Sequence, residues 1–150
     1  MRAPLGTFVH ARSGDKGGDA NLGLWVAHDV VSTGSTDGAG STDGAGSTDG
    51  AGSTDGAGST DGAGSTDERY DDRVAWLLAT VTPDFVRDLL PEAADLEVEV
   101  FALPNLGGVN VVLYGLLGRG VAASTRFDPQ AKGLGEWARS RHVEIPEALR

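Results

Sequence analysis

A hexapeptide repeat sets the first limit on what this chain can fold into. The sequence Ser-Thr-Asp-Gly-Ala-Gly occurs five times without a change from Ser35 to Gly64, and similar residues extend the stretch to Ser32–Asp67. This stretch has no large aliphatic or aromatic side chain, so it cannot bury enough apolar surface to offset its loss of conformational entropy. Calcium-binding and hexapeptide repeat folds need an aliphatic residue in each repeat, which is missing here. We therefore predict a flexible loop inserted into one domain that spans residues 1–150.

The insertion changes the charge balance on which further inferences depend. It is 36 residues long and holds six aspartates but no lysine or arginine, so removing its charges from the chain's −10 leaves −4 on the other 114 residues. Nucleic-acid-binding proteins normally present a basic face, so this balance argues against a nucleic acid as partner. About 110 residues are enough for one hydrophobic core. The added loop costs only about 2 kcal/mol at a surface turn.

Several classes of protein and site are excluded by what the sequence lacks. The chain has no cysteine, which excludes a disulfide framework and thiolate chemistry. No apolar run approaches the roughly 20 residues of a membrane span, and the N-terminus lacks the apolar core of a signal peptide. We therefore expect a soluble cytoplasmic protein with no membrane contact. The histidines His10, His28 and His142 lack metal-ligand spacing, so we expect neither a metal nor another cofactor.

Hydrophobic periodicity divides the first part of the remaining chain into strands and helices. Apolar residues at every second position predict strands, and those at every third or fourth position predict helices. Thr82-Pro83-Asp84 supplies an N-cap, a first-turn proline and a carboxylate favoured by the helix dipole. We expect strands at Leu5–His10, around Leu22–Val26 and at Leu96–Phe101, and helices around Val74–Val81 and over Pro83–Leu90.

The last third of the chain is harder to assign. Apolar residues at helical spacing predict a helix over Leu106–Leu117, but the β-branched run Val109–Val112 leaves a strand as the alternative. Strands and helices mixed in this way indicate a compact α+β sandwich of a small sheet with helices. We further predict a strand at Val121–Phe127, a helix from Asp128 to Trp137 and a short strand at Val143–Ile145.

The strongest candidate site is the glycine-rich run Arg12–Asn21, which follows the first predicted strand. Glycine lets backbone N–H groups turn toward a ligand, and Arg12 or Lys16 can meet an anion there. Three interpretations stay open, namely a structural turn with an Asp15–Lys16 surface pair, binding of an anion or carboxylate, and catalysis. For catalysis, His10 or Asp15 is the candidate base and Lys16 the electrostatic clamp. The spacing fits neither a Walker loop nor a Rossmann fingerprint.

Polar residues further along the chain extend the candidate binding set. Asn105 is either a turn or cap residue or a ligand contact. Asn110 lies in an apolar stretch where an inward amide needs a hydrogen-bond partner, and a link to the glycine-rich run would supply one. Ser124 and Arg126 share one face of a predicted strand, which is either solvated or suited to a carboxylate or phosphate. The predicted ligand-binding residues are Arg12, Ser13, Asp15, Lys16, Asn21, Asn105, Asn110, Ser124 and Arg126.

Three separated motifs follow one another along the chain. They are Arg12-Ser13-Gly14-Asp15-Lys16-Gly17 with Asn21, Leu103-Pro104-Asn105-Leu106 with Asn110, and Ser124 and Asp128 with Lys132-Gly133. In this order they resemble the AtuA-like ferredoxin-fold domain. The resemblance covers nearly everything outside the repeat. It implies a ferredoxin-like α+β fold and a stand-alone form of the C-terminal domain of the acyclic terpene utilisation protein AtuA. It also implies a setting near acyl-CoA carboxylases in terpenoid or branched-chain breakdown, but no assigned reaction.

Two functional hypotheses follow. The first is a non-catalytic binding or assembly module that recognises an acyl-CoA-type anion, a carboxylate or a partner subunit through Arg12, Lys16, Asn21 and Asn105. Its partners would be AtuA-type or acyl-CoA carboxylase proteins, or a second copy in a homo-oligomer. The alternative is a small enzyme acting on a carboxylated or CoA-thioester substrate. An enzyme should show a perturbed titratable group in a cleft, whereas a module should show an exposed apolar or self-complementary patch.

Overall fold

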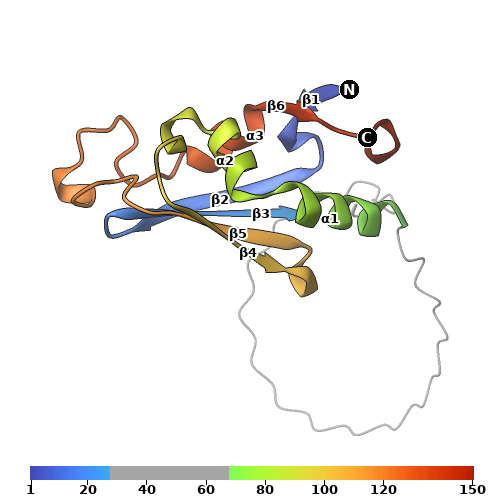
Figure 1. Ribbon diagram of the computed structural model, residues 1–150, viewed down its shortest axis with the longest axis horizontal. Helices are drawn as coiled ribbons and strands as arrows, with labels where there is room; N and C mark the ends of the chain where they lie inside the picture. The colour runs from blue at the N-terminus through green and yellow to red at the C-terminus, as the bar shows by residue number, and fades with distance from the viewer. Residues whose placement is uncertain (28–67) are drawn as a thin grey trace, which may run out of the picture. The chain divides into compact units, whose positions relative to one another are not determined.

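The computed structural model describes residues 1–27 and 68–150, so the predicted flexible loop and His28 lie outside the described residues. Within the described part, two antiparallel hairpins join into one four-stranded sheet of order β2-β3-β5-β4 (Figure 1). Its strands are β2 (Val9–Lys16), β3 (Asp19–Val26), β4 (Val98–Leu103) and β5 (Gly108–Leu113). Together with the helices, this sheet confirms the predicted α+β class.

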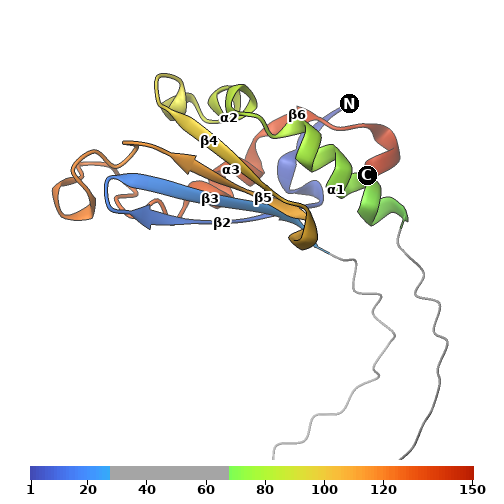
Figure 2. The ribbon, with the colours of Figure 1, turned by 60° about the horizontal axis from the view of Figure 1, so that its bottom comes forward.

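The helices of the described residues cover one face of this sheet (Figures 1 and 2). Helix α3 packs on β2, α1 packs on β3 and β5, and α2 packs on β4. A second small sheet pairs the N-terminal strand β1 with the C-terminal strand β6 beside the helices. The bounds are α1 (Glu68–Thr80), α2 (Pro83–Leu89), α3 (Leu134–Ser140), β1 (Arg2–Pro4) and β6 (His142–Glu144).

The core lies between the helices and the sheet. Leu22 and Leu24 of β3 and Val111 of β5 are buried, and helix residues Leu77 and Val86 pack into the same cluster. The alternate residues of the same strands face the other side of the sheet, where no described helix lies. Burial of about 25 cal/mol per Å² of apolar surface therefore stabilises one face of the sheet only.

Several sequence predictions are confirmed by these elements. The predicted strands around Leu22–Val26 and Leu96–Phe101 correspond to β3 and β4, and the predicted helix around Val74–Val81 is α1. Thr82 caps α2, because its Oγ1 accepts a hydrogen bond from the Phe85 N–H at 3.2 Å. The closing strand is present as β6, although it ends at Glu144.

The helix predicted over Leu106–Leu117 is wrong, and the alternative strand is correct. Residues Gly108–Leu113 form β5, which pairs with β3 on one side and β4 on the other. Val109, Val111 and Leu113 are buried, whereas Asn110 and Val112 are only half-buried. A central strand with apolar residues on both faces contains positions three and four apart that imitate helical spacing.

Two other predicted boundaries are also wrong. The predicted strand Val121–Phe127 is a one-turn 3₁₀-helix, Val121–Ala123, followed by a loop. The final helix begins at Leu134, because Asp128 closes a separate turn, in which its two carboxylate oxygens accept from the N–H groups of Lys132 and Gly133. In the described part of the chain, no helix is both long and apolar enough to cross a membrane.

Candidate functional site

The glycine-rich run is mainly strand rather than loop. Strand β2 begins at Val9, after a 3₁₀ turn at Leu5–Thr7, and runs through Lys16, so the strand predicted at Leu5–His10 is shifted along the chain. The turn comes only at Gly17, whose φ of +69° suits glycine. Because side chains alternate along a strand, the predicted site residues of this segment lie on two opposite faces of the sheet.

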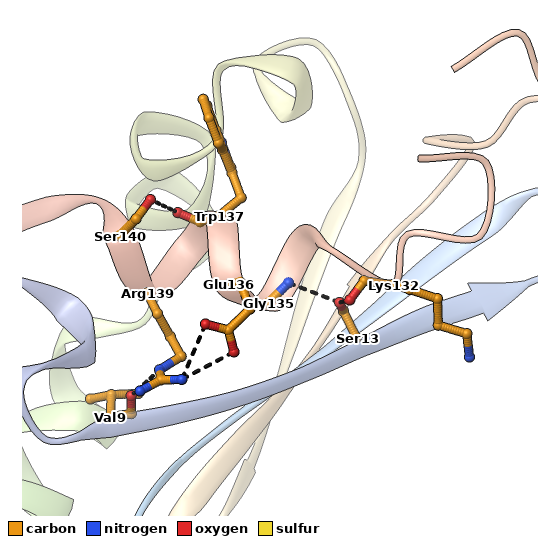
Figure 3. A network of polar contacts seen from close by, with 8 residues as sticks. All are labelled: Val9, Ser13, Lys132, Gly135, Glu136, Trp137, Arg139 and Ser140. Carbon is orange, nitrogen blue, oxygen red and sulfur yellow. Dashed lines mark hydrogen bonds and ion pairs between the residues drawn. The ribbon is translucent and has the colours of Figure 1, made fainter. Parts of the chain in front are cut away.

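Ser13 faces the helices and has a structural role. Its Oγ accepts a hydrogen bond from the Gly135 N–H at 2.8 Å and donates to the Lys132 carbonyl at 3.4 Å (Figure 3). Arg139, one turn further along α3, also ties this helix to β2, since its Nε donates to the Val9 carbonyl at 3.1 Å. These bonds hold α3 on β2, so Ser13 does not belong to a ligand site on the open face.

The face of the sheet without helices, here called the open face, collects most of the other predicted residues. The strand register places Arg12, Gly23, Asn110 and Phe101 in one row across it, and Gly14, Asn21, Val112 and Glu99 in the next. The Asn21 side-chain amide donates a hydrogen bond to Asn110 Oδ1, so the predicted link between Asn110 and the glycine-rich run is present.

Cations gather at the β2 edge of the open face. Arg12 and Lys16 lie on either side of Gly14 on the exposed side of the strand. Lys132 reaches this place from the loop before α3, because its Nζ lies 3.5 Å from the position that a Gly14 Cβ would occupy. Among the residues that the structure describes, these three side chains form no ion pair. Their charges therefore face solvent.

Carboxylates occupy the opposite edge, on β4 and directly before it. Glu97 and Glu99 are exposed there, and the Tyr114 hydroxyl donates to Glu99 Oε2 at 2.5 Å. This hydrogen bond is the main reason why the pKa of Tyr114 is raised above its ordinary value of 10.0, with lesser contributions from desolvation and from the charges of Glu99, Glu97 and Asp19. The two edges of the open face thus carry opposite charge.

Exposed apolar side chains lie at one end of this face. Phe101 is 47% exposed, and Trp25 and Leu103 are also among the exposed large hydrophobic residues. The His10 imidazole stacks on the Trp25 indole with ring centroids 6.0 Å apart. Trp25, Glu99 and Phe101 are not among the predicted site residues, although alternation along the two half-buried strands already places them on the exposed faces.

The remaining predicted residues do not join this group. Asp15 lies on the helix side of β2, so it is separated by the sheet from His10 and Lys16. Asn105 is exposed in a 3₁₀ turn between β4 and β5, Pro104–Leu106. Ser124 and Arg126 are in the loop before α3 and therefore do not share a strand face. Residues 1–27 and 68–150 contain no cluster of metal-ligating side chains.

Comparison with known protein families matches residues 66–144 to the AtuA ferredoxin-like domain. The matched segment is more than half of the chain. The chain belongs to this family. No curated protein and no solved structure matches it. The matched segment of this AtuA ferredoxin-like domain contains α1, the β4–β5 hairpin and α3, whereas Arg12 and Lys16 lie before it.

Proposed function

We propose that this AtuA ferredoxin-like domain is an assembly module in which the open faces of two copies stack on each other. The observation that supports it most strongly is the separation of charge across that face. Arg12, Lys16 and Lys132 lie at the β2 edge, and Glu97 and Glu99 lie at the β4 edge. A face with opposite charges at its two edges is complementary to a rotated copy of itself.

The rotation that brings these charges together is a two-fold axis parallel to the strands, between β3 and β5. It lays β2 of one copy over β4 of the other, and β3 over β5, because the strand order is β2-β3-β5-β4. Each Glu99 then meets the cations around Gly14 of the second copy. Since the interface is two-fold symmetric, this contact occurs twice.

The sizes of the side chains agree with this arrangement. The same rotation places Asn110 of one copy over Gly23 of the other, so an amide meets a position without a side chain. It places Phe101 over Arg12, a pairing in which the ring face attracts the guanidinium. At Gly14 the missing side chain lets the Lys132 ammonium approach, so Glu99 meets a cation there. The apolar end of the face meets its own copy, because the axis runs along the strands.

The area of the open face sets the size of the proposed interface. Four strands with six paired residues in the centre, spaced about 4.8 Å apart with a rise of about 3.4 Å per residue, give a projected area of roughly 400 Å². Protruding side chains raise the accessible area of such a face toward the lower end of stable interfaces, about 600 Å² on each partner. We therefore expect a dimer with a dissociation constant in the micromolar range.

The setting implied by the family resemblance belongs to the same proposal. An acyl-CoA or other carboxylate anion would meet the same cations, Arg12, Lys16 and Lys132, and would therefore compete with the second copy. AtuA-type or acyl-CoA carboxylase proteins would be the further partners. The alternative of a small enzyme has less support, because its candidate base Asp15 lies on the opposite face of the sheet from Lys16.

Charge reversal tests the stacked arrangement with the full chain. Glu99→Arg places a cation against cations at both contacts, and Arg12→Glu with Lys16→Glu places carboxylates against Glu99 at both contacts. Each variant alone should stay monomeric. An equimolar mixture of the two restores attraction at both contacts, so it should dimerise. Sedimentation velocity from about 1 µM to about 1 mM measures the association.

Glu147→Arg is the matched control, because Glu147 is an exposed carboxylate near the C-terminus and outside the open face. This variant should dimerise like the unaltered chain. An unaltered chain that stays monomeric at about 1 mM overturns the proposal. A mixture that stays monomeric, while the unaltered chain dimerises, overturns the two-fold arrangement. Dissociation of the dimer by a coenzyme A thioester, with no effect of a neutral thioester, would support competition by an anion.

A further inference from the structure

A cavity of about 800 Å³ lies beside α3, outside the open face. Pro91 and Glu92, in the short 3₁₀ turn after α2, form one wall, and residues of the loop before α3 and of α3 itself form the other. Small-molecule sites commonly have volumes of about 300–1,000 Å³. None of the residues used in the proposed dimer lines this cavity, so it is an independent feature.

Aromatic and aliphatic side chains form most of its walls. Trp137 points away from β2 toward this side of α3 (Figure 3), and its side chain is 50% exposed. The Arg141 guanidinium lies 5.5 Å from the Trp137 ring and is itself tied to the Leu89 carbonyl, which orients the indole. Phe127 is fully exposed at the rim, and Leu134 is buried at the wall. Exposed aromatic rings around a cavity are typical of sites for apolar ligands.

One guanidinium supplies the hydrogen-bond donors. Arg126 lines the cavity, and its Nη2 donates to Glu92 Oε2 at 2.6 Å. The two side chains are 28% and 34% exposed, so this pair is partly shielded from water. Within the part of the chain that the structure describes, the Arg126 Nε is buried without a hydrogen-bond partner. The guanidinium therefore has donor capacity beyond its bond to Glu92.

The carboxylates near the cavity determine which ligand charge it favours. Asp128 is committed to the turn before α3, because both of its oxygens accept backbone N–H groups. Together with Glu92 it gives the lining residues two negative charges against the one positive charge of Arg126, and Arg141, which contacts the Trp137 ring, does not line the cavity. A further anion would be repelled, whereas a neutral acceptor oxygen would not. This differs from the carboxylate or phosphate predicted for Ser124 and Arg126 on a shared strand face.

We infer that this cavity binds a neutral, mostly apolar molecule that presents one carbonyl-type oxygen to Arg126. The aromatic walls receive the apolar body, and the guanidinium, kept in place by Glu92, donates to the oxygen. A hydrogen bond from a charged donor discriminates well, because an analogue without the acceptor leaves that donor unpaired.

Three probes of nearly equal shape separate these contributions: acetylnaphthalene, ethylnaphthalene and naphthoate. Binding is followed by the indole N–H signal of Trp137 in a ¹⁵N-labelled chain, identified by its loss in Trp137→Phe. We expect acetylnaphthalene to bind about tenfold more tightly than ethylnaphthalene, which corresponds to one hydrogen bond to a charged group. Naphthoate should bind most weakly. Failure of all three probes to shift the Trp137 signal, or tightest binding of naphthoate, overturns the inference.

Two variants assign the effect to the named side chains. Arg126→Met removes the donor, so acetylnaphthalene and ethylnaphthalene should bind equally. Arg87→Met is its control, because Arg87 also pairs with a carboxylate, Asp84, but does not line the cavity. Glu92→Gln removes one negative charge and should tighten naphthoate binding several-fold, a result that does not depend on whether Arg126→Met folds. If the preference for acetylnaphthalene survives in a folded Arg126→Met chain, the inference is wrong.

Discussion

The two faces of the four-stranded sheet use alternate residues of the same strands, yet they differ in almost every property. On the covered face, Leu22, Leu24 and Val111 are buried beneath the helices. On the open face, Arg12 and Glu99 carry solvent-exposed charge. The covered face therefore holds most of the apolar burial that stabilises the fold, and the open face is free to vary in charge and shape. The residues that stabilise the fold and the residues that the proposed dimer uses therefore alternate along the same strands.

The largest expected effect contrasts one apolar residue from each face. Leu22→Ala removes a fully buried side chain from the core and should lower the free energy of unfolding by about 2–5 kcal/mol. Phe101→Ala removes a larger side chain that is 47% exposed, and it should cost less than about 1 kcal/mol in the dilute monomer. Urea unfolding at low micromolar concentration measures both. Equal losses in the two variants would show that the open face contributes to the monomer core.

The second effect concerns the one polar side chain buried on the covered face of β2. Ser13→Ala leaves the Gly135 N–H without its acceptor, so the free energy of unfolding should fall by about 1–3 kcal/mol. Ser140→Ala is the matched control, because its Oγ donates to the Trp137 carbonyl at the surface, and its loss should change stability by less than about 0.5 kcal/mol. Thermal unfolding of both variants makes the comparison. If Ser13→Ala unfolds like the unaltered chain, Ser13 does not hold α3 on the sheet.

Local sequence signals correctly predicted the elements that have a recognisable capping motif or a clear apolar alternation. The Thr82-Pro83-Asp84 motif predicts where α2 begins, and period-two alternation predicts the strand β3. The same signals failed at Arg12–Lys16, where glycine, aspartate and lysine favour a turn. That segment is a strand because each of its residues pairs with β3 across the hairpin, and pairing of this kind overrides local propensity.

The parts of the site that could not be predicted depend on contacts between distant segments. Lys132 lies beside Gly14 only because α3 docks on the edge of the sheet, and no periodicity in the sequence links the two positions. Arg126, in the loop before α3, meets Glu92, in a 3₁₀ turn 34 positions earlier in the sequence. The link between Asn21 and Asn110 could be anticipated, because an amide within an apolar stretch needs a partner and the other motif offered one.

The smallest expected effect is a titration on the open face. The hydrogen bond to Glu99 favours the neutral phenol of Tyr114 and raises its pKa above 10.0, so the stabilisation is complete below pH 10.0 and is lost as the pH rises through the higher pKa of the folded state. Glu99→Ala should lower the pKa of Tyr114 toward 10.0, and Glu97→Ala, which removes only a more distant charge, should lower it less. Absorbance of the phenolate in a dilute sample, between about pH 9 and the onset of alkaline unfolding, follows the change. An equal shift in both variants would mean that the summed charge of β4, rather than the hydrogen bond, sets this pKa.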